Sequence, residues 1–145
     1  MLPISWARRI ADRLRGLPAR PRGARGAGRD WERAAERELV AQGYRILERN
    51  YAAGPRDTEL DLVAEENGVV CFVEVKGRSS TAFGSPALAV TAEKQRRVAR
   101  AARSWLARRR APTPPCRFDV VCVTAVDGRV DVEIIRDAFR LTNGS

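Results

Sequence analysis

The sequence predicts an α/β fold in which a mixed β-sheet is flanked by helices. Two stretches, residues 31–42 and 91–110, carry apolar residues at helical spacing. Short apolar runs typical of strands lie between and after them. Two connections between these runs, Asn67-Gly68 and Asp127-Gly128, favour the tight turns of β-hairpins. The predicted order is therefore helix, three strands, helix and two strands.

The first predicted helix covers residues 31–42 and has a signal at each end. Asp30 has the short acceptor side chain of a helix N-cap, and Gly43 follows as a C-terminal stop. The strands expected after this helix cover residues 44–51, 57–64 and 69–76, with a loop containing Gly-Pro over residues 52–56.

The second predicted helix is capped by Thr91 and ends near Arg110, before a cluster of prolines. A continuous apolar run at residues 118–124 is typical of a strand that is buried on both faces. The Asp127-Gly128 turn leads from it into a last strand over residues 130–135. The inward face of the helix is expected to consist of Val98, Ala101, Ala102 and Trp105.

Length and charge indicate one domain over residues 30–141, preceded by a basic tail over residues 1–29. The tail is rich in Pro, Gly and Arg, and we expect it to be disordered or partly helical. It holds eight arginines and one acid, so it supplies +7 of the net charge of +9. Such a tail binds nucleic acid or an anionic membrane, or only keeps the protein soluble. No segment has the roughly 18–20 consecutive apolar residues of a membrane span.

The residue types restrict the available chemistry. The chain has no histidine, which excludes histidine zinc sites and nucleophiles activated by histidine. The cysteines, Cys71, Cys116 and Cys122, are expected to be small buried hydrophobes of a cytoplasmic protein. Lysine is scarce, because 25 of the 27 basic residues are arginine and only Lys76 and Lys94 are lysine.

The Asn67-Gly68 turn fixes a register for the strands on either side of it. If the residues next to a two-residue turn pair with each other, Asp61 lies opposite Glu74, and Glu59 opposite Lys76. Strand side chains alternate with period two, so these four charged residues are expected to share one face. Two carboxylates about 5 Å apart repel by roughly 3 kcal/mol at an effective dielectric constant near 20.

A divalent cation would remove the repulsion between Asp61 and Glu74. Mg²⁺ prefers oxygen ligands, and a bound Mg²⁺ or Mn²⁺ can activate water for phosphodiester hydrolysis. Lys76 would orient that water or neutralise developing charge. The alternative is a surface face on which Glu59 and Lys76 form an ion pair while both other acids are solvated.

Both predicted helices could contribute to such a site. Glu32 is either a third acid or an anion placed in the first helical turn, where the helix dipole stabilises it. The second helix is strongly basic, which suits contact with DNA phosphates, although a solvated outer face explains the same charges. Its predicted DNA-binding residues are Lys94, Arg96, Arg97, Arg100 and Arg103.

A series of short motifs extends this interpretation over residues 28–139. They are E-x-x-A-x-x-x-L-x-x-x-G-Y from Glu32, ILERNY at 46–51, ELDLVA at 59–64, FVEVKGR at 72–78, FGSP at 83–86, KQRR at 94–97 and RFDVV at 117–121. In this order they resemble the uncharacterised YraN-like family, which looks like a branch of the PD-(D/E)xK nuclease superfamily.

The resemblance implies a restriction-endonuclease-like fold and a set of site residues. It implies metal ligation by Asp61 and Glu74, a catalytic lysine at Lys76 and catalytic support from Glu32. Glu59 falls on an acid characteristic of the family, and Glu59 and Gln95 are taken as supporting residues. The sequence departs from the family pattern at residue 31, a tryptophan where the family usually has glycine.

The expected function is a Mg²⁺- or Mn²⁺-dependent DNA endonuclease, acting on branched or damaged DNA, without a small-molecule cofactor. Two alternatives stay open: a non-catalytic DNA-binding module, and an adaptor subunit of a DNA-processing assembly. The sequence also leaves open whether the protein forms a homodimer.

Overall fold

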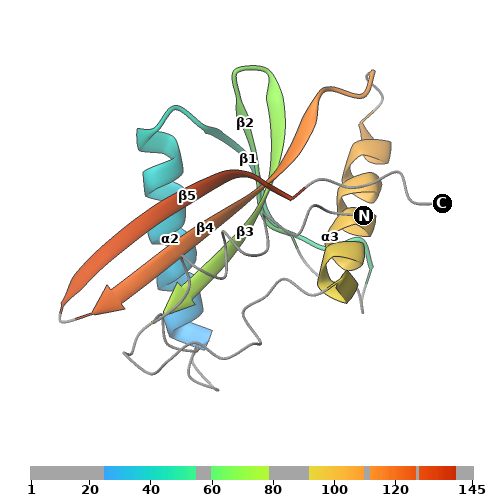
Figure 1. Ribbon diagram of the computed structural model, residues 1–145. Helices are drawn as coiled ribbons and strands as arrows, with labels where there is room; N and C mark the ends of the chain where they lie inside the picture. The colour runs from blue at the N-terminus through green and yellow to red at the C-terminus, as the bar shows by residue number, and fades with distance from the viewer. Residues whose placement is uncertain (1–24, 55–59, 79–91, 110–111, 127, 140–145) are drawn as a thin grey trace.

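The computed structural model describes residues 25–54, 60–78, 92–109, 112–126 and 128–139. It confirms the predicted fold class and element order (Figure 1). The elements are α2 (Arg25–Ala41), β1 (Arg45–Tyr51), β2 (Leu60–Glu66), β3 (Val69–Arg78), α3 (Ala92–Arg108), β4 (Cys116–Val126) and β5 (Arg129–Phe139).

The five strands form one mixed sheet in the order β1-β2-β3-β4-β5. Neighbouring strands are antiparallel except at the centre, where β3 and β4 are parallel. Parallel neighbours need a crossover connection, and α3 lies in that connection.

The two helices cover opposite faces of the sheet. Val98 and Trp105 of α3 pack with Phe72 in one core cluster, whereas Ala35 and Leu39 of α2 pack with Val73 in the other. Because Phe72 and Val73 are consecutive residues of β3, their side chains point to opposite faces. Figure 1 shows α2 and α3 on either side of the sheet. The predicted inward residues of α3 are all buried in the first cluster.

Helix α2 begins at Arg25 rather than after Asp30, so the predicted N-cap is wrong. Helix propensity is a weak prior, and here the helix extends back through Gly26 and Gly28 despite their cost. Its end is as predicted. Gly43 has φ 98°, its amide donates to the Val40 carbonyl, and the Tyr44 amide donates to the Leu39 carbonyl, which is the pattern of a Schellman motif. The last five residues of the predicted tail therefore belong to α2, and residues 1–24 lie outside the described residues.

The β2–β3 hairpin has the predicted register. Asn67 and Gly68 both have positive φ, 51° and 80°, as a type I′ turn requires. The ladder begins at Glu66–Val69 and ends at Leu62–Val73. Asp61 and Glu74 are the next positions in this register.

The other strands are close to their predicted bounds, with some extensions. β4 and β5 are longer than residues 118–124 and 130–135. β5 continues to Phe139 past a register irregularity opposite Phe118–Val120. The predicted cap Thr91 and the first residues of the strand expected at 57–64 lie outside the described residues. Cys71 and Cys122 are buried as predicted, but Cys116 is exposed.

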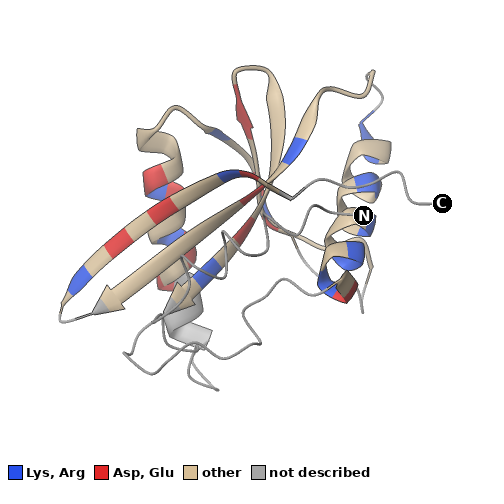
Figure 2. Ribbon diagram, viewed as in Figure 1, with Lys and Arg blue, Asp and Glu red and all other residues tan. Residues whose placement is uncertain are grey.

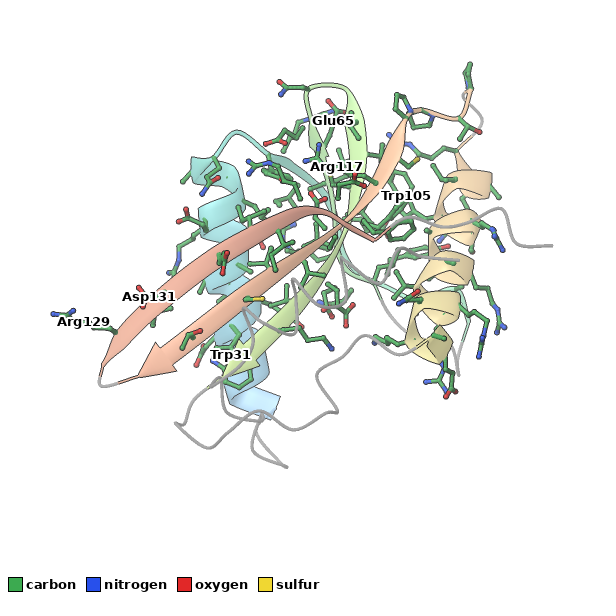
Figure 3. All side chains as sticks on the ribbon, viewed as in Figure 1. Trp31, Glu65, Trp105, Arg117, Arg129 and Asp131 are labelled. Carbon is green, nitrogen blue, oxygen red and sulfur yellow. The ribbon has the colours of Figure 1, made fainter. Side chains whose placement is uncertain are left out.

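A network of charges fastens the end of the sheet at the β2–β3 turn. Asp119 is fully buried and accepts hydrogen bonds from the Tyr44 hydroxyl, the Arg117 guanidinium and the Asp137 amide, each at 2.9 Å. Arg117 also donates to Glu66 at 2.6 Å. Figure 3 shows Arg117 near Glu65 at this end of the sheet, away from Trp31. The opposite end of the sheet, near Trp31, holds a different set of charged residues.

Among the described residues, no helix is both long and apolar enough to cross a membrane.

Candidate functional site

Glu74 of β3 is a buried carboxylate near the Trp31 end of the sheet. It is 6% exposed and, two residues from Phe72, lies on the face that α3 covers. Its Oε1 atom is 3.2 Å from Nζ of Lys94 and 3.5 Å from Nζ of Lys76. Its Oε2 atom is buried and has no hydrogen-bond partner among the residues that the structure describes. A buried carboxylate oxygen without a partner is costly, so this oxygen is one that could serve a ligand.

Both lysines of the chain therefore contact the same carboxylate oxygen. Lys76 follows Glu74 by two residues on β3, and Lys94 is the third residue of α3. The prediction from the sequence placed Lys76 in the site but assigned Lys94 only to DNA. The scarcity of lysine was the signal that applied to both residues, and only the position of α3 reveals that they meet.

Asp61 completes the centre of the site. Its Oδ2 atom accepts a hydrogen bond from the Val75 amide at 2.8 Å, just past the last pair of the β2–β3 ladder. Burial, and after it the negative charge of Glu74, raise the pKa of Asp61 to about 8. The Val75 hydrogen bond and the charge of Lys94 act in the opposite direction. Burial and the charge of Glu74 therefore oppose the ionisation of Asp61, and a nearby positive charge favours it.

The alternation of side chains in β2 breaks at Asp61. Leu60 packs in the core cluster on the α3 side, although Leu62, two residues later, packs on the α2 side. The backbone of the neighbouring strand β1 is also irregular at this level, because Asn50 has a positive φ of 52°. The alternation of side chains therefore cannot be used to place residues that precede Asp61 in the sequence. Glu59, which that argument placed opposite Lys76, lies outside the described residues.

Glu32 lies on α2 and acts on Asp61 through its charge. It is the eighth residue of α2, so the helix-dipole explanation for its position is wrong. Its negative charge contributes to the raised pKa of Asp61. Glu32 also lines an open groove of about 760 Å³ between α2 and β1, together with Arg33 and Arg37.

Trp31 and Gly77 pack closely beside the site. A Cβ atom built on Gly77 would lie 1.8 Å from the Trp31 ring, so only glycine fits there without movement of the ring. Trp31 is 7% exposed, and Figure 3 shows it at the end of β3. The tryptophan therefore covers the backbone directly after Lys76.

The donor set is compatible with one divalent cation. Carboxylate oxygens are the ligands that Mg²⁺ and Mn²⁺ prefer, and Asp61 and Glu74 supply them where one oxygen of Glu74 has no other described partner. Within the described residues, no three Asp, Glu or Cys side chains gather as a metal-binding group. A cation held there would therefore complete its coordination with water and with a substrate phosphate.

The outer face of α3 is basic (Figure 2). Arg96, Arg100 and Arg103 are exposed, whereas Arg97 donates to Glu93 at 2.9 Å one turn away. Gln95 is half-buried near Lys94 in the sequence. The predicted DNA-binding residues thus all lie on one helix, whose first turn reaches the carboxylate site through Lys94.

Comparison with known proteins identifies relatives over most of the chain. The family described as "Uncharacterised protein family UPF0102" matches residues 31–123. A UPF0102 protein of Symbiobacterium thermophilum is 49% identical over 117 residues, which are 80% of this chain and 98% of the relative. A UPF0102 protein of Chlorobium phaeobacteroides is 44% identical over 77% of this chain and 92% of its own length. A third, from Trichlorobacter lovleyi, is 42% identical over 86% of this chain and 98% of the relative.

Proposed function

The chain belongs to the UPF0102 family, as its resemblance to YraN-like proteins predicted, and we propose that it is a Mg²⁺- or Mn²⁺-dependent DNA endonuclease. One observation carries the proposal: the buried carboxylate of Glu74 gathers both lysines on one oxygen and leaves the other without a described partner, next to Asp61. A protein that only binds DNA has no need of two carboxylates that repel each other.

Asp61 and Glu74 would hold the cation, which supplies Lewis acidity and lowers the pKa of bound water. The Val75 amide fixes one oxygen of Asp61, so that the other can turn toward a ligand. Glu32 adds negative charge near Asp61 and would support the cation from α2.

Lys76 would act on the reacting groups. Its ammonium is held beside Glu74 and is partly exposed, so it can donate to the attacking water or to a phosphate oxygen. Hydrolysis adds water across one P–O bond and leaves a phosphomonoester on one strand end and a hydroxyl on the other. A cation placed where charge develops lowers the barrier more than it stabilises the bound substrate.

The basic face of α3 would bring the substrate to the site. Arginines on this face neutralise backbone phosphates regardless of base sequence. The first turn of α3 holds Lys94 beside Glu74. A DNA backbone that runs along the helix would therefore reach the carboxylates. Branched or damaged DNA is the substrate class that we expect from the family resemblance.

The direct test is cleavage by the purified protein of linear, nicked, flapped and four-way DNA, with Mg²⁺ or Mn²⁺ and with chelator. We expect cleavage only with the cation and none by Lys76→Ala, which should still bind DNA. Cleavage that persists with chelator, or in Lys76→Ala, would exclude the proposed chemistry.

A non-catalytic DNA-binding or adaptor module is the second candidate. It is favoured by the two lysines, which already compensate the charge of Glu74 without a cation. Such a module would bind the same DNA with equal affinity in Mg²⁺ and in chelator, and it would leave every substrate intact.

A further inference from the structure

The two lysines at Glu74 do not hold equivalent positions. Lys76 belongs to the same strand as Glu74 and stays beside it whatever α3 does. Lys94 comes from α3 and lies closer to Oε1, at 3.2 Å against 3.5 Å. The positive charge of Lys94 also acts to lower the pKa of Asp61, although burial and the charge of Glu74 raise it more. Lys94, which α3 supplies, is thus a cation that acts on Asp61 as well as on Glu74.

A position that acts on both Asp61 and Glu74 is also where a shared divalent cation would bind. A divalent cation and two ammonium groups around one carboxylate would repel one another strongly in a half-buried site, so we expect one of the two lysines to move away. The Lys94 side chain is 29% exposed and is flexible, as lysine stems are. It can therefore withdraw toward solvent, whereas the buried Glu74 cannot.

We propose that Lys94 is a resident counter-ion of Glu74, which it leaves when a divalent cation binds between Glu74 and Asp61. The proposal rests on the metal site proposed above. Lys94 keeps the two carboxylates compensated in the metal-free protein and competes with the cation for them. Its withdrawal would free the ammonium for a substrate phosphate, the role that the sequence predicted for it.

Calorimetric titration with Mn²⁺ tests the competition. Lys94→Gln should bind Mn²⁺ about tenfold more tightly than the wild type, since one nearby positive charge, screened by solvent and salt, is removed. Lys94→Arg keeps the charge and should not gain affinity. Arg97→Gln is the matched control, because it removes a charge one turn along α3 that pairs with exposed Glu93, and it should bind as the wild type does.

The outcomes separate this proposal from the metal site itself. Equal Mn²⁺ affinity in wild type and Lys94→Gln would overturn the counter-ion role and leave the metal site intact. Absence of binding in both proteins would overturn both. A gain in Arg97→Gln equal to that in Lys94→Gln would reduce the effect to general charge and also overturn the proposal.

A measurement on the wild type avoids any effect of the substitution on folding. Because the chain has only two lysines, protein labelled with ¹³Cε-lysine gives two assignable sets of signals. Lys94→Arg identifies which set belongs to Lys94. Saturation with Mg²⁺ should move the Lys94 signals toward those of a solvent-exposed lysine. Lys94 signals that stay unchanged while Mg²⁺ raises the melting temperature would contradict the proposal.

Discussion

The choice between lysine and arginine carries information at the scale of single residues. Arginine is the usual cation of this chain, yet both lysines contact Glu74. Lysine is a compact charge on a flexible stem, whereas arginine is a planar fork that is always charged. A small ammonium fits beside a bound cation and donates to one oxygen, which is the role proposed for Lys76.

Lys76→Arg should fold and bind DNA but lose cleavage by about 10²-fold or more, the scale of losing one transition-state donor. Single-turnover cleavage measures the loss, and a thermal melt and a binding titration serve as controls. Near-wild-type cleavage by Lys76→Arg would return Lys76 to the role of a simple ion-pair partner of Glu74.

Gly77→Ala should destabilise the protein by about 1–3 kcal/mol, the usual cost of overpacking, because its Cβ atom would clash with the Trp31 ring. Chemical denaturation gives the free energy of unfolding. In a Trp31→Ala background the same change should cost much less. An equal cost in both backgrounds would show that the ring is not the obstacle.

The elements differ in how far the sequence determined them. A type I′ turn requires positive φ at both central positions, and Asn67-Gly68 adopts it readily. The turn and its register could therefore be predicted from local chemistry. Gly43 defined the end of α2 for a similar reason. The start of α2 could not be predicted, because glycines and arginines give no clear boundary. The pairing of Lys94 with Glu74 depends on where α3 packs, which no local signal specifies.

The outer face of α3 leads to a prediction about DNA binding. Arg96→Ala with Arg103→Ala should weaken binding and reduce the slope of log affinity against log salt by up to about two units, roughly 0.9 for each lost phosphate contact. Arg129→Ala, an exposed arginine at the tip of the β4–β5 hairpin (Figure 3), should leave the slope unchanged. Identical slopes in all three proteins would locate the DNA surface away from α3.

At the scale of the whole molecule, two sets of charged residues lie at opposite ends of the sheet. At the turn end, Asp119, Arg117 and Glu66 form compensated pairs. At the other end, Asp61 and Glu74 repel each other, and one oxygen of Glu74 has no described partner. The sequence predicted the acids of the second end from the hairpin register. It did not predict the first network, because its members come from β2, β4, β5 and the connection between α2 and β1, and they meet only after folding.

The turn-end network predicts sensitivity to acid. Hydrogen bonds from Arg136, followed by those from Arg117, lower the pKa of Glu66 to about 2. A carboxylate with a lowered pKa stabilises the fold above its ordinary pKa, and this contribution is lost as pH falls from about 4.5 toward 2. The melting temperature of the wild type should therefore fall more between pH 5 and pH 3, on the order of several degrees, than that of Glu66→Gln. Parallel curves for the two proteins would contradict this role of Glu66.

Mn²⁺ binding followed by electron paramagnetic resonance tests most directly whether Asp61 and Glu74 together hold a divalent cation, because the signal reports free Mn²⁺. Asp61→Asn is the informative variant, since its amide oxygen can still accept the Val75 hydrogen bond while the charge is lost. The wild type should bind one Mn²⁺ that Mg²⁺ displaces. Asp61→Asn and Glu74→Gln should lose that site, and a thermal melt should show that both variants are folded. Mn²⁺ binding that is unchanged in both variants, or absent from the wild type, would show that Asp61 and Glu74 do not form a metal site.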